Sequence, residues 1–134
     1  MVCIYCGGTT AVNNSRQQKR NNTVWRRRQC GLCDAIFTSV EQAELSTVLR
    51  IKQSSTKLEP FIRDILFVSI FDSCKHRPTA LEDAIGLTAT CVAAIIAVAK
   101  DGILTRNTII DEVAAILDRF DKSAATMYRA YHPL

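Results

Sequence analysis

Four of the six cysteines in this 134-residue sequence lie in two pairs with the same internal spacing. Cys3 and Cys6 form the first pair, Cys30 and Cys33 form the second, and two residues separate the members of each pair. Such a short turn lets two thiolates reach one metal ion, and two turns complete a tetrahedral four-thiolate site. The spacing therefore predicts one structural Zn²⁺ held by these four side chains.

Disulfides and a rubredoxin-like iron are the alternatives for the same cysteines. No basic-then-apolar leader opens the sequence, so we expect a cytoplasmic protein, in which disulfides are rare. An ion with four thiolate ligands has no open position for water, so its expected task is folding and not catalysis. Cys74 and Cys91 lie in apolar helical stretches, and we interpret them as buried core thiols.

Positive charge is concentrated beside the cysteines. Residues 1–40 carry six basic side chains and one acidic one, whereas residues 41–134 carry 11 basic and 12 acidic ones. Arg26, Arg27 and Arg28 directly precede the second pair, and Arg16 lies nearby in the sequence. In a strand their directions alternate, so Arg26 and Arg28 share one face and Arg27 lies on the other.

Two interpretations of the basic run remain open. Arginine suits phosphates and guanine edges, which predicts double-stranded DNA as the partner of Arg16 and of the run 26–28. Alternatively, the run is a solvated charge cluster that balances the negative four-thiolate ion. Trp25 is either a base-stacking platform or a core residue of the small domain, and we expect the core.

The pattern along the chain predicts an α+β fold with two domains. Short strands are expected at residues 10–12, 23–25 and 36–40, and together they form a small antiparallel zinc ribbon over residues 1–45. Residues 46–134 are expected to hold a β-hairpin and about four helices, with Pro78 and Asp101-Gly102 between helices. The longest uncharged apolar run, residues 86–99, is too short to cross a membrane.

Seven short motifs occur in order along nearly the whole chain. They are Met1-x-Cys3-x-x-Cys6-Gly7, Asn14-Ser15-Arg16, Arg26-Arg27-Arg28-x-Cys30-x-x-Cys33, Phe37-Thr38-Ser39-x-Glu41, Glu59-Pro60-Phe61-x-Arg63, Cys74-Lys75-x-Arg77-Pro78 and Met127-Tyr128-Arg129. In this combination the chain resembles the NrdR family, bacterial repressors of ribonucleotide reductase genes. The resemblance implies a DNA-binding zinc ribbon followed by an ATP-cone, a domain that binds ATP or dATP and controls homo-oligomer formation.

The cone half departs from the family pattern. The family usually has a lysine two positions after Arg63, where this chain has Ile65, and its hairpin usually carries two basic residues and then Asp-Gly. The corresponding stretch is Lys52-Gln53-Ser54-Ser55-Thr56, which has one basic residue and no glycine. Lys52 and Arg63 remain as the candidate partners of nucleotide phosphates. We therefore expect ATP and dATP to bind more weakly than in relatives, or not at all.

The expected function is a zinc-dependent, DNA-binding transcriptional repressor that acts as an oligomer. The resemblance implies that ATP or dATP regulates it through oligomer formation. The alternative is a zinc-ribbon module for protein or RNA, with a cone that no longer binds nucleotide. No membrane partner is expected. The two histidines lie outside any Ser/His/Asp or Cys/His grouping and no P-loop is present, so we do not expect an enzyme.

Overall fold

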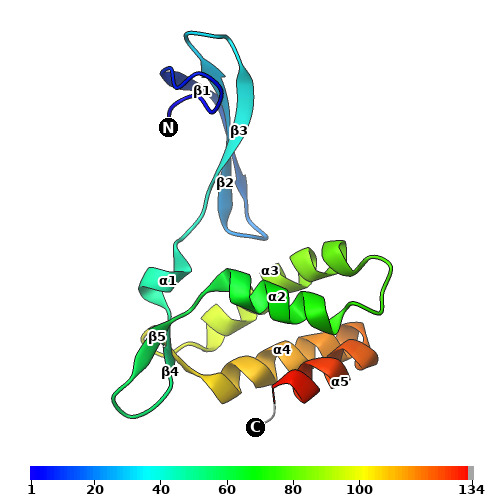
Figure 1. Ribbon diagram of the computed structural model, residues 1–134. Helices are drawn as coiled ribbons and strands as arrows, with labels where there is room; N and C mark the ends of the chain where they lie inside the picture. Colours follow the sequence, from blue (N-terminus) through cyan, green and yellow to red (C-terminus); the bar gives the residue numbers. More distant parts are fainter. Residues whose placement is uncertain (133–134) are drawn as a thin grey trace. The chain divides into compact units, whose positions relative to one another are not determined.

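The structure is a computed structural model that describes residues 1–132, and it contains two compact units (Figure 1). The first is Met1–Ala43 and the second begins at Glu44, two residues before the boundary expected from the sequence. Antiparallel strands make up the first unit, and the second is mainly helical with a small mixed sheet. The predicted α+β class is confirmed.

The first unit is built on an antiparallel sheet in the order β1-β2-β3. Its strands are β1 (Thr10–Gln18), β2 (Thr23–Cys30) and β3 (Ile36–Glu41). β1 and β2 extend well beyond the predicted residues 10–12 and 23–25, since their pairing continues through polar side chains until Gln18 meets Thr23. Polar, alternating strands carry a weak apolar signal, which is why the sequence pattern marked only part of each strand.

This first unit has almost no apolar core. Cys3, Thr23 and Cys30 are its buried side chains, and Trp25 remains 48% exposed. The expectation that Trp25 lies in a core is therefore wrong: the sheet forms a single layer in this unit, and no second layer covers the indole. A domain of this size with so little buried apolar surface requires another source of stability.

The second unit opens with α1 (Leu45–Val48), β4 (Arg50–Lys52) and β5 (Leu58–Pro60). β4 and β5 pair as the predicted antiparallel hairpin, and β6 (Ile103–Thr105) pairs in parallel with the other edge of β4. Neither α1 nor β6 was expected, because elements of three or four residues show no apolar period. Gly102 (φ +72°) leads into β6, and a Cβ there would collide with the carbonyl oxygen of Val48.

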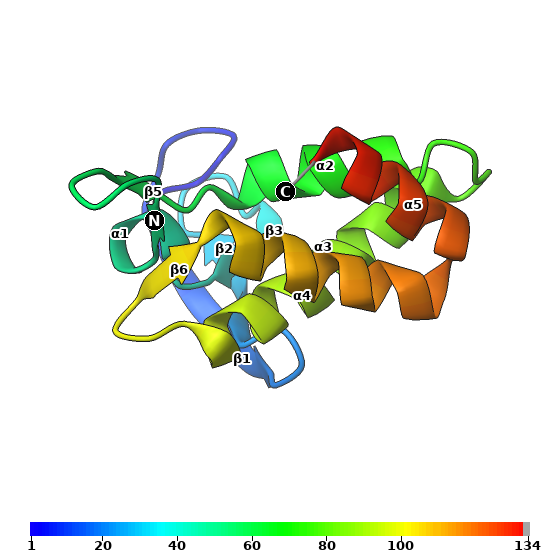
Figure 2. The ribbon, with the colours of Figure 1, turned by 90° about the horizontal axis from the view of Figure 1, so that it is seen from below.

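Four longer helices complete this unit. They are α2 (Arg63–Ser73), α3 (Ala80–Val98), α4 (Arg106–Phe120) and α5 (Lys122–Tyr131). α2 packs against α3 and α5, and α4 packs against the same two helices (Figure 2). Their shared core includes the fully buried side chains of Ile70, Ile95, Val113, Leu117 and Tyr128.

Some large apolar side chains of the helices are exposed. Ile65 of α2 and Leu81, Ile85 and Ile96 of α3 follow a helical apolar period in the sequence, yet each of them is about half exposed or more. The buried face of α3 combines small side chains, such as Ala84 and Cys91, with Leu87 and Ile95. Small residues let neighbouring helix backbones approach closely, so the helix face that carries them can be buried. A sequence pattern based on large apolar residues selects a different face of the same helix.

α3 is also the helix of residues 1–132 that is long and apolar enough to cross a membrane by length and composition. One such helix is weak evidence, because the central helix of a globular core passes the same test. The fully buried Ala84, Cys91 and Ile95 place α3 in the core of the second unit.

Candidate metal centre and nucleic-acid interface

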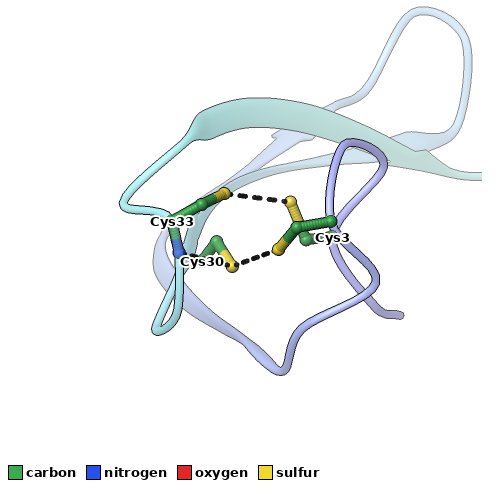
Figure 3. Close-up of side chains that lie close together, drawn as sticks. Cys3, Cys30 and Cys33 are labelled. Carbon is green, nitrogen blue, oxygen red and sulfur yellow. Dashed lines mark hydrogen bonds between the residues drawn. The ribbon is translucent and has the colours of Figure 1, made fainter.

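The two cysteine pairs meet beside one end of the β1–β3 sheet. All four Sγ atoms lie within 4.8 Å of one another. Figure 3 shows the side chains of Cys3, Cys30 and Cys33 converging on this site. The Sγ atoms of Cys3 and Cys33 are 3.7 Å apart, and those of Cys6 and Cys30 are 3.5 Å apart. A tetrahedral metal with metal–sulfur bonds of about 2.3 Å requires sulfurs about 3.8 Å apart. The sulfur positions therefore fit a four-thiolate ion such as Zn²⁺.

Backbone amides of both turns point at the sulfurs. The N–H groups of Tyr5, Gly8 and Leu32 donate to the Sγ atoms of Cys3, Cys6 and Cys30 at 3.4, 3.4 and 3.3 Å. Gly7 (φ +74°) and Asp34 (φ +59°) adopt left-handed conformations that reverse the chain just after each pair. Gly8 lies against the site: a Cβ there would be 3.2 Å from Cys30 Sγ and 3.3 Å from Cys6 Sγ.

The sulfurs perturb one another's ionisation. The amides of Cys33 and Leu32 lower the pKa of Cys30 to about 6. The pKa of Cys33 is raised to about 12, because the Cys6 sulfur, burial and the other sulfurs outweigh the lowering effect of the Ala35 amide. Closely packed thiols resist ionising together, and a divalent cation would supply the missing positive charge.

The other two cysteines do not join this cluster. Cys74 and Cys91 are fully buried in the core of the second unit, as predicted. Burial is the main reason that the pKa of Cys74 is raised, and it raises the pKa of Cys91 to about 12. Both are therefore protonated, unreactive thiols at neutral pH.

The basic run divides between the two faces of the sheet. On one face, Arg26 donates to Ser15 Oγ at 3.0 Å and pairs with Glu41 at 3.1 Å. Arg28 lies on the same face and donates to Ser39 Oγ at 2.9 Å. Both side chains are therefore tied to the sheet, whereas Arg27 points to the opposite face and is exposed.

The opposite face carries a shallow hollow, and all three strands contribute residues to its lining. We call it the tryptophan face; its residues are Asn14, Arg16, Trp25, Arg27 and Thr38. In the strand register Arg16 pairs with Trp25, while Asn14 and Thr38 both pair with Arg27. Two of the four arginines proposed from the sequence are thus brought together here. The exposure of Trp25 was missed, although its alternation with Arg26 and Arg28 places it on the same side as Arg27.

The two candidate nucleotide-binding residues, Lys52 and Arg63, lie toward opposite ends of the β4–β5 hairpin. Lys52 is exposed at the turn end of the β4–β5 ladder, where it pairs with Leu58. Arg63 begins α2, three residues beyond the opposite end of that ladder at Pro60. The other two hairpin cations are occupied, since Lys57 pairs with Glu59 at 2.8 Å and Arg50 donates to the carbonyl oxygen of Ser46.

A serine–histidine contact, not expected from the sequence, joins α2 to the end of α5. Ser69 Oγ lies 2.5 Å from His132 Nε2, and burial, together with the charge of Arg106, lowers the pKa of His132. Within residues 1–132 no carboxylate bonds to this imidazole, so the contact lacks the orienting acid of a catalytic triad. It holds two helices together.

The fold and the sulfur cluster define the class of this protein: a zinc-ribbon domain followed by a mainly helical domain. Residues 1–41 match the family model described as "Transcriptional repressor NrdR-like, N-terminal domain". Three similar proteins are each named "Transcriptional repressor NrdR". The one from Streptococcus gordonii is 30% identical over 135 residues, which cover 98% of this chain and 85% of that protein.

The other two alignments are shorter. The repressor from Symbiobacterium thermophilum is 35% identical over 82 residues, and one from Streptococcus pneumoniae is 38% identical over 84. These alignments cover 61% and 62% of this chain, and they span only about half the length of each relative, 54% and 53%. The nearly full-length match shows that the chain belongs to the NrdR family.

Proposed function

We propose that this protein is a zinc-dependent DNA-binding transcriptional repressor, acting in the cytoplasm on ribonucleotide reductase genes. The observation that carries the proposal is the sulfur cluster of Cys3, Cys6, Cys30 and Cys33 at the base of an arginine-bearing sheet. The names of its relatives add support for transcriptional repression. No catalytic role is proposed.

The zinc would stabilise the folded state of the first unit. Cys3 and Cys6 would hold the N-terminal turn against the β2–β3 turn that carries Cys30 and Cys33, and so fix the sheet between them. Structural zinc contributes on the order of 10 kcal/mol to such small folds. A closed four-thiolate shell supplies no activated water, and the ion takes part in no reaction.

The arginines would bind duplex DNA in two different ways. Arg16 and Arg27 are exposed and free to reach the phosphates of a duplex. Arg26 and Arg28 are held by side chains of the sheet, so they stiffen the strands and offer only their remaining donors to DNA. Of the four, Arg27 therefore distinguishes DNA binding most clearly from a purely structural role.

Fluorescence anisotropy tests this proposal with a labelled promoter duplex of a ribonucleotide reductase gene and an unrelated duplex of equal length. Arg27→Ala should weaken promoter binding about 10- to 100-fold. It should also reduce the log–log salt slope by about 0.9. Wild-type protein that binds neither duplex, or an Arg27→Ala variant with unchanged affinity and slope, would refute the proposal.

The second unit would assemble copies of this chain, with weak or absent control by ATP or dATP. Leu81, Ile85 and Ile96 form an exposed apolar strip along α3, which supports homo-oligomer contacts through this helix. Around the hairpin, Lys52 and Arg63 are the cations assigned to a triphosphate, and they lie at opposite ends of the ladder. Weak nucleotide binding follows from that separation of the two charges.

A further inference from the structure

The tryptophan face combines an exposed aromatic ring with two positive groups. Trp25 lies on the central strand and is 48% exposed. Its neighbours across the sheet are Arg16 on β1 and Val40 on β3, and Arg27 is two residues farther along β2 on the same side. A half-exposed indole offers a flat apolar ring to a ligand, and the arginines beside it favour a ligand that carries negative charge.

The two faces of the sheet differ in how their arginines are engaged. Arg26 and Arg28 are hydrogen-bonded to side chains of the sheet on one face. In the part of the chain that the structure describes, the guanidinium groups of Arg16 and Arg27 make neither an ion pair nor a side-chain hydrogen bond. The tryptophan face therefore offers two unoccupied cations beside its ring, as an anionic ligand requires.

The width of the sheet decides which form of nucleic acid can reach the ring. Its three strands, spaced by about 4.8 Å, place the outer backbones about 10 Å apart before side chains are added. The major groove is about 12 Å wide and admits a helix or a two-stranded ribbon. A flat three-stranded face is too broad to bring its central residue to base edges in that groove. An unpaired base, by contrast, can lie directly on an exposed indole.

We propose that the tryptophan face binds single-stranded nucleic acid, with an unpaired base stacked on Trp25 and the flanking phosphates held by Arg16 and Arg27. Asn14 and Thr38 border the same hollow and supply donors and acceptors for base or sugar edges. This activity shares the zinc-stabilised sheet with the proposed function and goes beyond duplex binding. Stacking on an indole is tolerant of base identity, so a pyrimidine homopolymer is a suitable ligand.

Trp25 is the sole tryptophan of the chain, so its own fluorescence reports on the contact. Zinc-loaded, full-length protein is titrated with dT12 and with rU12, and the two arms separate DNA from RNA as the source of the strand. Quenching of the emission that saturates with at least one oligonucleotide is expected. The oligonucleotides are added until binding measured by anisotropy saturates, or up to about 100 µM, the range of weak non-specific binding. Emission that stays unquenched by both dT12 and rU12 at these concentrations overturns the proposal.

Variants of Trp25 test the stacking contact. Trp25→Ala should weaken oligonucleotide binding about 5- to 100-fold, whereas Trp25→Phe should retain most of the affinity because it keeps a flat ring. Val40→Ala is the matched control, an exposed apolar side chain beside Trp25 whose loss should change binding less than twofold, on the order of a surface effect. Equal affinity of wild type and Trp25→Ala for both strands would refute stacking.

The same variants are tested on the promoter duplex, and zinc content is checked for each. Trp25→Ala should leave duplex affinity nearly unchanged. An equal loss for duplex and single strand would contradict the assignment of this face to single strands. Failure of wild-type protein to bind duplex, with intact quenching by dT12 or rU12, would refute the proposed repressor function and leave the single-strand activity standing.

Discussion

Gly8 shows how closely the first unit is fitted around its sulfurs. The residue lies next to Cys6, and a Cβ there would come within 2.9 Å of Leu32 Cβ as well as 3.2 Å of Cys30 Sγ. Distances below about 3.4 Å force neighbouring atoms to move. Because two of those neighbours are the proposed metal ligands Cys6 and Cys30, any movement would distort the tetrahedron.

Gly8→Ala should therefore weaken zinc binding without removing a ligand. We expect a loss of about 10- to 100-fold in zinc affinity, the range seen when the surroundings of metal ligands are disturbed. Competition with a chromophoric chelator measures it. Gly31→Ala is the control, since a Cβ at Gly31 would meet only the Thr9 carbonyl oxygen at an ordinary 3.7 Å. Equal zinc affinities for the two variants would show that Gly8 does not shape the site.

Predictions about single residues succeeded where residue type and spacing alone determine the chemistry. The Cys-x-x-Cys pairs predicted the sulfur cluster that the structure contains, and strand alternation correctly separated Arg27 from Arg26 and Arg28. The position of Trp25 was misjudged, because burial depends on whether a second layer covers the sheet. No local pattern reports that.

At the scale of elements, one polar cluster joins the loop before α3 to the junction between α4 and α5. Arg77 donates to Asp83 at 2.8 Å and to Asp121 at 2.9 Å, and His76 Nε2 lies 3.1 Å from the same Asp121 oxygen. Asp121 also caps α5 by accepting from the Ala124 amide. The His76, Ala124 and Arg77 contacts hold the pKa of Asp121 well below its usual range.

Asp121→Asn should lower the free energy of unfolding of the helical unit at neutral pH. The folded pKa of Asp121 lies below the unfolded value of about 3.9, so its contribution is complete above about pH 4 and is lost as the pH falls through the folded pKa. Urea unfolding followed by circular dichroism at 222 nm measures this difference at pH 7, 5 and 3.

The difference between Asp121→Asn and wild type should be present at pH 7 and 5 and smaller at pH 3. Asp111→Asn, a change at an exposed residue of α4, is the control and should alter stability little at any of these values. If Asp121→Asn were as stable as wild type at pH 7, the cluster would not stabilise the helix junction.

The order and type of the long elements could be predicted from the sequence, and their packing faces only in part. Pro78 and Asp101-Gly102 separate helices as expected. The buried side of α3 follows Ala84 and Cys91, which fit close to neighbouring helices, and not Leu81 and Ile85. Which face is buried depends on the size of the gap between helices, a property of the assembled core.

At the scale of the whole chain, the two units divide charge and apolar surface between them. Residues 1–40 hold an excess of five positive charges, while the large buried cluster belongs to the unit that begins at Glu44. The first unit is therefore suited to a polyanion and depends on a metal, whereas the second can fold on its apolar core. In the second unit the two candidate nucleotide cations, Lys52 and Arg63, lie at opposite ends of the β4–β5 ladder.

Calorimetric titration with ATP and with dATP should show no micromolar binding to the wild-type protein. Each missing charged contact costs about 1.5–3 kcal/mol, so two of them weaken binding about 100-fold or more. Ile65→Lys should strengthen binding, because position 65 is exposed and accepts a charged side chain. Micromolar binding by wild type would contradict the prediction. Unchanged affinity after Lys52→Ala and Arg63→Ala would then reject those two residues as phosphate partners.

We expect one zinc ion to fold the first unit into the DNA-binding part of the molecule. Promoter-duplex anisotropy of Cys30→Ser beside wild type measures this dependence, with bound zinc and the signal at 222 nm recorded on the same samples. Cys30→Ser should lose its zinc and its DNA binding but keep its helices, whereas Cys91→Ala, which removes a core thiol, should keep both zinc and DNA binding. Full-affinity DNA binding by zinc-free Cys30→Ser protein would show that DNA binding does not depend on the zinc.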